Sequence, residues 1–104
     1  MIQLSIDGKQ KGKFELGTLY LTRGVFDACE KDAAFYEFVK NSVRRHVSGD
    51  WGDMSEEDKR ENEFSLDKHL RIFSAYDHQQ PDKKIWVITE ADRSTTTVLF
   101  PDEY

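Results

Sequence analysis

The order of apolar and polar residues divides the chain into strands, then helices, then strands again. At the start, apolar residues alternate with polar ones from Ile2 to Ile6 and run into Asp7-Gly8, which predicts a half-buried strand ending in a tight turn. Aromatic and β-favouring side chains then become frequent, and they predict a second strand at about residues 18–22.

The middle of the chain changes to the helical period. Between residues 26 and 47, one helix face collects the apolar side chains and a histidine, at Phe35, Phe38, Val39, Val43, His46 and Val47. Asp32 is the expected N-cap of the main helix, and Gly49 is its expected stop. Arg44 and Arg45 fall in the last turn, where positive charge interacts favourably with the helix dipole.

A further helix is expected to begin at Ser55, because a capping hydroxyl there is followed by three acids in the first turn, where the dipole favours carboxylates. Its large apolar residues are chiefly Phe64, Leu66 and Leu70. We therefore expect this helix to bury a narrow apolar stripe and to leave most of its carboxylates in water.

The last third of the chain predicts three strands, at residues 71–76, 84–89 and 95–100. Residues 85–88 are apolar on both faces, which is typical of a strand in the interior of a sheet. At 104 residues the chain is long enough for one hydrophobic core. We predict a single α+β domain over residues 1–104, with an antiparallel sheet of about four to five strands and two or three helices packed on one face.

Composition places this domain among folded proteins with a strongly solvated surface. Charged residues make up 34% of the chain, yet seven Phe, four Tyr and two Trp supply the material of a core. Cys29 is the single cysteine, so an internal disulfide is excluded. The sequence contains no apolar stretch that could cross a membrane, and its start lacks a secretion signal, so we expect a cytoplasmic location.

The acidity of the chain is concentrated in one segment. Residues 50–67 hold eight acids and two bases, a net charge of −6, and because the whole chain carries −5, the remainder carries +1. A localised field of one sign selects partners of the opposite sign and repels phosphate. We therefore expect a basic protein surface as partner, with no direct contact to nucleic acid or membrane.

The helix dipole explains the first acids of this segment but not those beyond the first turn, Glu61, Glu63 and Asp67. We predict a partner-binding surface formed by Asp50, Trp51, Asp53, Glu56, Glu57, Asp58, Glu61 and Glu63. The indole of Trp51 fits either a lid folded over the core or an exposed anchor, and the lid is favoured because small domains extend their limited cores with loop aromatics.

Two chemical alternatives remain open. Asp50 and Asp53, with Glu56 or Glu57, could bind a hard cation in a small metal-dependent hydrolase or nuclease. Their spacing does not match a calcium-binding loop, and a turn with a helix cap is the favoured explanation. Cys29 could pair with a histidine, but its apolar neighbours favour packing. We therefore predict a nonenzymatic protein without a cofactor or bound metal, as a monomer or homodimer.

Several blocks together resemble an uncharacterised family of small plasmid-related proteins carried on bacterial phages, plasmids and integrated elements. The blocks are residues 22–25, 45–53, 74–76, 84–94 and 100–104, of which Gly-Asp-Trp-Gly-Asp and Thr-Glu-Ala-Asp-Arg-Ser are the most distinctive. The resemblance covers most of the chain beyond residue 17, and the segment before Gly17 departs from it.

The resemblance implies a genetic setting rather than an activity. In a phage or plasmid, a protein whose carboxylates imitate backbone phosphates would have a nucleic-acid-binding host defence complex as its target. The sequence therefore favours a counter-defence inhibitor of the anti-CRISPR or antirestriction type.

Overall fold

The computed structural model describes residues 2–4, 12–78 and 84–104. Within these ranges the elements are, in chain order, β1 (Ile2–Leu4), β2 (Thr18–Leu21), α1 (Arg23–Lys31), α2 (Ala33–Val47), α3 (Glu56–Lys68), β3 (Ile72–Asp77), β4 (Lys84–Thr89), β5 (Thr95–Leu99) and a 3-10 helix, η1 (Pro101–Glu103). None of the described helices is long and apolar enough to span a membrane. The predicted turn at Asp7-Gly8 lies outside the described residues.

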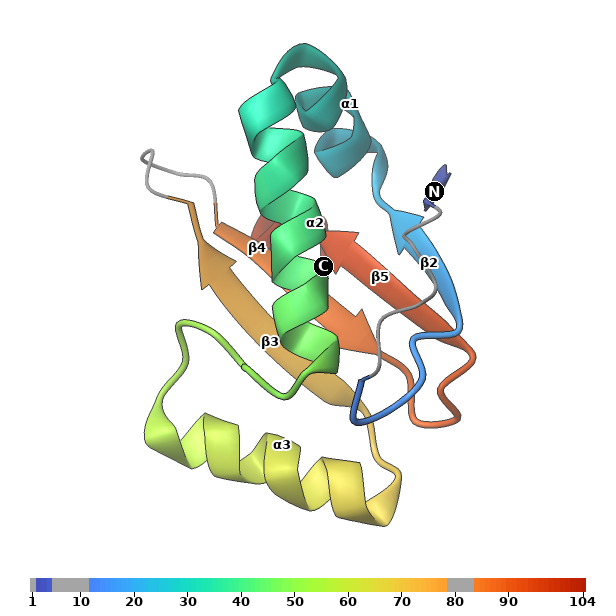
Figure 1. Ribbon diagram of the computed structural model, residues 1–104, viewed down its shortest axis with the longest axis vertical. Helices are drawn as coiled ribbons and strands as arrows, with labels where there is room; N and C mark the ends of the chain where they lie inside the picture. Colours follow the sequence, from blue (N-terminus) through green and yellow to red (C-terminus); the bar gives the residue numbers. More distant parts are fainter. Residues whose placement is uncertain (1, 5–11, 79–83) are drawn as a thin grey trace.

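The described strands form one mixed sheet in the order β1-β2-β5-β4-β3. Helices α1 and α2 lie over one face of this sheet, and α3 lies at its end beside β3 (Figure 1). The predicted α+β class is confirmed. Two details differ: β2 and β5 pair in parallel, and α3 covers an edge of the sheet rather than its face.

The parallel pair follows from the path of the chain after β2. Thr18 pairs with Thr95 and Leu21 with Val98, so that the first and last thirds of the sequence meet in the middle of the sheet. A parallel pair needs a long crossover, and here all three helices and two strands separate the partners. β4 is paired on both sides, as its apolar pattern predicts, although β5 is the middle strand.

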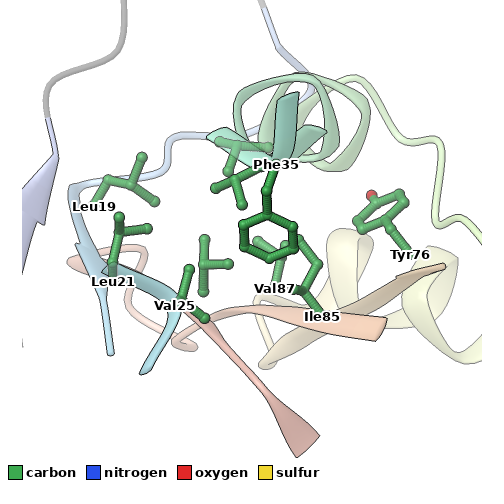
Figure 2. Close-up of a cluster of buried hydrophobic side chains, with 10 residues drawn as sticks. Leu19, Leu21, Val25, Phe35, Tyr76, Ile85 and Val87 are labelled. Atoms are coloured by element: carbon green, nitrogen blue, oxygen red, sulfur yellow. The ribbon is translucent and has the colours of Figure 1, made fainter. Parts of the chain in front are cut away.

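The main core lies between the sheet and the helices α1 and α2. Figure 2 shows Phe35 pointing from α2 toward Ile85 and Val87 on the sheet. The cluster consists of Leu19, Leu21, Val25, Phe35, Val39, Val43, Tyr76, Ile85, Val87 and Val98. The strand members alternate along their strands, and those of α2 follow the helical period, because one face of each element is removed from water.

Short polar side chains decide where the helices begin. Asp32 accepts hydrogen bonds from the amides of Ala34 (3.0 Å) and Phe35 (3.3 Å), which confirms it as the N-cap of α2. Ser55 caps α3 by accepting from the amide of Asp58 at 3.1 Å, as predicted. Thr22, placed in a strand by the sequence pattern, instead caps α1 directly after β2.

A chain of hydrogen bonds crosses the core from α2 to the sheet. Oγ of Ser74 lies 2.5 Å from Nδ1 of His46, and Nε2 of His46 lies 2.9 Å from Oγ1 of Thr89. That oxygen lies 2.7 Å from Oγ1 of Thr96, which donates to the carbonyl oxygen of Leu16 at 2.7 Å. Each group has a partner, as buried polar atoms require.

The hydrogen bond from Thr96 to Leu16 determines which group donates in each of the other bonds. Because Thr96 donates to Leu16, Thr89 has to donate to Thr96 and to accept from His46. His46 is therefore a neutral imidazole with its proton on Nε2, and Ser74 donates to its Nδ1. Burial and, to a smaller extent, the positive charge of Arg93 lower the pKa of His46 to about 3.

The buried imidazole makes folding pH-dependent. In the unfolded chain His46 takes up a proton below about pH 6.5, whereas in the folded chain it stays neutral until about pH 3. The contribution of neutral His46 to folding stability is therefore complete above the pKa that this residue has in the unfolded chain. It decreases as the pH drops below that value. We expect urea unfolding to show a loss of about 2 kcal/mol between about pH 7 and about pH 5.

The control for this prediction is His46→Gln. It should be less stable than the native chain at about pH 7, and its stability should change much less down to about pH 5, because the residue that takes up the proton is gone. Equal pH slopes for the two proteins would contradict the assignment.

Candidate functional site

The segment that carries the predicted surface covers the outer edge of β3. An edge strand presents a row of unpaired amides and carbonyls, which have to be satisfied or shielded. On β3, the backbone amides and carbonyls that point away from β4 belong to Phe73, Ala75 and Asp77. They are hydrogen-bonded by residues 51–53 and by Asn62. The acidic loop and helix therefore have a structural task at this edge.

Residues 51–53 continue the sheet by a short parallel bridge. The amide of Ala75 donates to the carbonyl of Trp51 at 3.3 Å, and the amide of Asp53 donates to the carbonyl of Ala75 at 2.7 Å. Oδ2 of Asp53 accepts from the amide of Asp77 at 2.8 Å. Gly52 has φ +82°, and a Cβ there would collide with the Ala75 carbonyl, so this position requires glycine.

Asn62 supplies the next pair of bonds along the same edge. Its Oδ1 accepts from the amide of Phe73 at 3.1 Å, and its Nδ2 donates to the carbonyl of Phe73 at 2.5 Å. A carboxamide can imitate a peptide group because it carries one acceptor beside its donors. Asn62 is 4% exposed and is the buried residue of α3. The sequence offers no apolar signal for it, so pattern analysis missed it.

Asp50 is held by the end of α2. Arg45 donates to it through two nitrogens, Nε to Oδ2 at 2.7 Å and Nη2 to Oδ1 at 3.2 Å. This guanidinium holds the pKa of Asp50 below its usual range. The carbonyl of Asp50 accepts from the hydroxyl of Tyr76 at 2.6 Å. Part of the charge reversal between α2 and α3 thus forms an ion pair, between Arg45 at the end of α2 and Asp50 in the loop.

Trp51 is a lid over the core. Its side chain is 4% exposed, packs edge-on against His46 at 6.0 Å between ring centroids, and lies roughly parallel to Phe14 at 6.2 Å. Its Nε1 donates to Oε2 of Glu63 at 2.7 Å. The lid interpretation is confirmed, and the exposed-anchor interpretation is wrong because the indole is covered. Glu63 is correspondingly engaged within the fold.

Two of the three apolar side chains expected to form a buried stripe at α3 are exposed to solvent. Phe64 is 58% exposed and Leu70 is 46% exposed, whereas Leu66 is half-buried. The expectation that Phe64 and Leu70 form a buried stripe is wrong. The physical reason is that α3 lies against the polar edge of β3, so its inward contacts are hydrogen bonds made by Asn62 and Glu63.

The predicted surface residues divide into two groups. Asp50, Trp51, Asp53 and Glu63 bond within the fold, whereas Glu56, Glu57, Asp58 and Glu61 are exposed on α3. Glu56 lies 3.5 Å from Nζ of Lys59. No cation lies within ion-pair distance of the other three acids among residues 2–4, 12–78 and 84–104.

The outer face of α3 also carries a shallow depression of about 650 Å³. It is lined by Glu57, Arg60, Glu61, Phe64, Ser65 and Leu70. A smaller depression of about 250 Å³ lies on the other side of Glu61 and Ser65, and Asp58, Arg71 and Phe73 contribute to it.

The described residues support neither the metal-binding alternative nor the nucleophile alternative. In the described part of the chain, no group of three or more His, Cys, Asp or Glu side chains is arranged to hold a metal ion. Burial and, to a smaller extent, the negative charges of Asp32 and Glu30 raise the pKa of Cys29 to about 11, so the thiol is a poor nucleophile near neutral pH.

Comparisons with protein-family models, curated proteins and solved structures found no match to this chain.

The first prediction for this site concerns Asn62. Asn62→Ala leaves the amide and carbonyl of Phe73 without their partners, so we expect a loss of about 2–4 kcal/mol of unfolding free energy in urea titrations. Asn62→Asp should be worse at about pH 7 than at about pH 4, because an ionised carboxylate cannot donate to the Phe73 carbonyl.

Asn41→Ala is the matched control. Asn41 is exposed on α2 and accepts from Arg44 at 2.9 Å. Its loss should change stability by less than about 0.5 kcal/mol. Similar effects at Asn41 and Asn62 would refute the special role of the β3 edge.

The second prediction concerns Cys29. Iodoacetamide should alkylate the folded protein at about pH 7.5 at least about a hundredfold more slowly than the urea-unfolded chain, because the thiolate fraction is small at the raised pKa. A comparable rate in both states, measured by intact mass, would show a reactive thiol instead.

Proposed function

We propose that this chain is a nonenzymatic protein-binding domain that uses the acidic outer face of α3 against a basic surface of a protein partner. The observation that carries the proposal is the exposure of Glu57, Asp58 and Glu61 on a helix that is attached to the sheet through its other side. Charges that are not neutralised within the fold remain available for complementary charges on a partner.

The attachment of α3 makes this surface pre-organised. Ser55 fixes its start, Asn62 fixes its middle to β3, and Arg93 donates to the carbonyls of Ser65 (3.2 Å) and Leu70 (2.6 Å) at its end. A surface that is already ordered loses less conformational entropy on binding. The acids are therefore presented by a helix held at three points.

A mobile-element setting supplies the candidate class of partner. Glu57 and Glu61 lie about one helical turn apart, about 6 Å along the axis of α3, so they present negative charges in a row, as successive phosphates of a nucleic-acid strand do. A protein groove that binds nucleic acid is positively charged, and this charge is complementary to the carboxylates on α3. We propose a host CRISPR or restriction complex, met in the cytoplasm, as the target.

The alternative of a metal-dependent hydrolase is disfavoured by the contacts of its two central acids. Arg45 occupies both oxygens of Asp50, and the amide of Asp77 occupies one oxygen of Asp53. A cation would have to displace an ion pair and break the bond that covers the β3 edge.

The test is affinity capture from a host lysate that contains a CRISPR or restriction system, compared with a lysate that lacks it. We expect Glu57→Lys combined with Glu61→Lys to reduce capture at least about tenfold, because each reversal replaces an attraction by a repulsion. Capture by the native chain should also weaken as salt rises from about 0.05 to about 0.5 M.

The matched control is Glu15→Lys combined with Glu30→Lys, which makes the same change in net charge at two exposed acids outside α3. The control should retain capture. If both double variants lose it equally, the effect is one of net charge and the proposed surface is wrong; if neither loses it, the acids of α3 do not bind the partner.

A further inference from the structure

Helix α3 exposes a large apolar side chain, Phe64, to solvent. Within the described residues, the large hydrophobic side chains that are exposed are Phe64, Leu70 and Tyr104. Two of these three lie together, in the depression on the outer face of α3. Exposed aromatic and aliphatic side chains next to each other are typical of interaction sites rather than of solvated helix faces.

The chain holds Leu70 in place beside the helix. His69 ends α3 in the left-handed conformation, with φ +57°, and turns the backbone back toward the last helical turn. The amide of Leu70 donates to the carbonyl of Ser65 at 2.9 Å, and Arg93 donates to the carbonyl of Leu70 at 2.6 Å. Both backbone groups of Leu70 are thus engaged, so its exposed position is part of the fold.

Charge surrounds this apolar pair on the helix. Glu57, Glu61 and Phe64 follow one another at spacings of four and three residues, which places them on one helix face. Arg60 is the base that lines the depression with them. The rim therefore carries two carboxylates and one guanidinium, a net negative charge around an apolar floor.

From this arrangement we infer that the depression formed by Glu57, Arg60, Glu61, Phe64, Ser65 and Leu70 receives a protein segment that presents a large apolar side chain next to Lys or Arg. The inference rests on the proposed function and specifies the chemistry of the partner. The apolar side chain covers Phe64 and Leu70, and the flanking cations face Glu57 and Glu61.

Charge complementarity selects this occupant over others. Phosphates of nucleic acids or of anionic lipids would meet the carboxylates of the rim and be repelled. A second copy of this chain, which carries a net charge of −5, would bring the same carboxylates together if α3 packed on α3. A basic and apolar protein segment satisfies both parts of the site.

The test selects peptides for the site. A phage-displayed library of random peptides of about 12 residues is panned on the native protein, with removal of phage that bind Phe64→Ser combined with Leu70→Ser. We expect the enriched peptides to contain a large apolar residue beside Lys or Arg. In fluorescence anisotropy, a synthetic copy of an enriched peptide should lose at least about tenfold in affinity for the double variant.

The controls separate the site from a general loss of surface. Tyr104→Ser removes a side chain that is 70% exposed and does not line the depression, and it should leave the affinity unchanged. The circular dichroism spectrum and melting temperature of the double variant should match those of the native chain, because Phe64 and Leu70 are exposed. A peptide with Glu in place of each Lys or Arg should not bind.

Each other outcome decides against the inference. Enriched peptides that are acidic or lack apolar residues, or that bind the double variant as well as the native chain, would overturn it. Binding of the native chain to phosphatidylcholine vesicles that is lost in the double variant would assign the depression to a lipid surface instead. If Glu57→Lys with Glu61→Lys abolishes capture of the lysate partner while the Phe64 and Leu70 variant retains it, this inference fails and the proposed function stands.

Discussion

The outer edge of β3 has to be hydrogen-bonded, and much of the chain between α2 and β3 is arranged by that requirement. The edge takes its partners from three sources, the backbone of residues 51–53, the carboxylate of Asp53 and the carboxamide of Asn62. A buried amide or carbonyl left without a partner costs about 1–3 kcal/mol. The loop and α3 are therefore parts of the sheet as much as they are surface elements.

This constraint also explains why α3 exposes what other helices bury. A helix that packs on a sheet face turns its apolar residues inward, but α3 meets a row of polar groups and attaches to them through Asn62. Phe64 on α3 and Leu70 just after it are consequently left on the outside, beside Glu57 and Glu61. The features that favour partner binding thus follow from how the helix is attached.

The same end of the molecule contains the pH-sensitive part of the core. Trp51, which belongs to the edge-covering segment, packs against His46, and His46 bonds to β3 and β4 through Ser74 and Thr89. Protonation of the imidazole would disturb both the lid and the strands beneath it. Stability at this end therefore depends on keeping His46 neutral, which its burial does down to about pH 3.

Local chemistry made much of this protein predictable from its sequence. The caps Asp32 and Ser55, the strand Lys84–Thr89 and the α+β class depend on neighbouring residues or on periodicity, which a sequence displays directly. The parallel pairing of β2 with β5, the role of Asn62 and the outward position of Phe64 depend on residues distant in the chain. The sequence identified an acidic segment, but only the tertiary structure decided which carboxylates bond inside the fold and which face water, because that choice depends on where the edge of β3 lies.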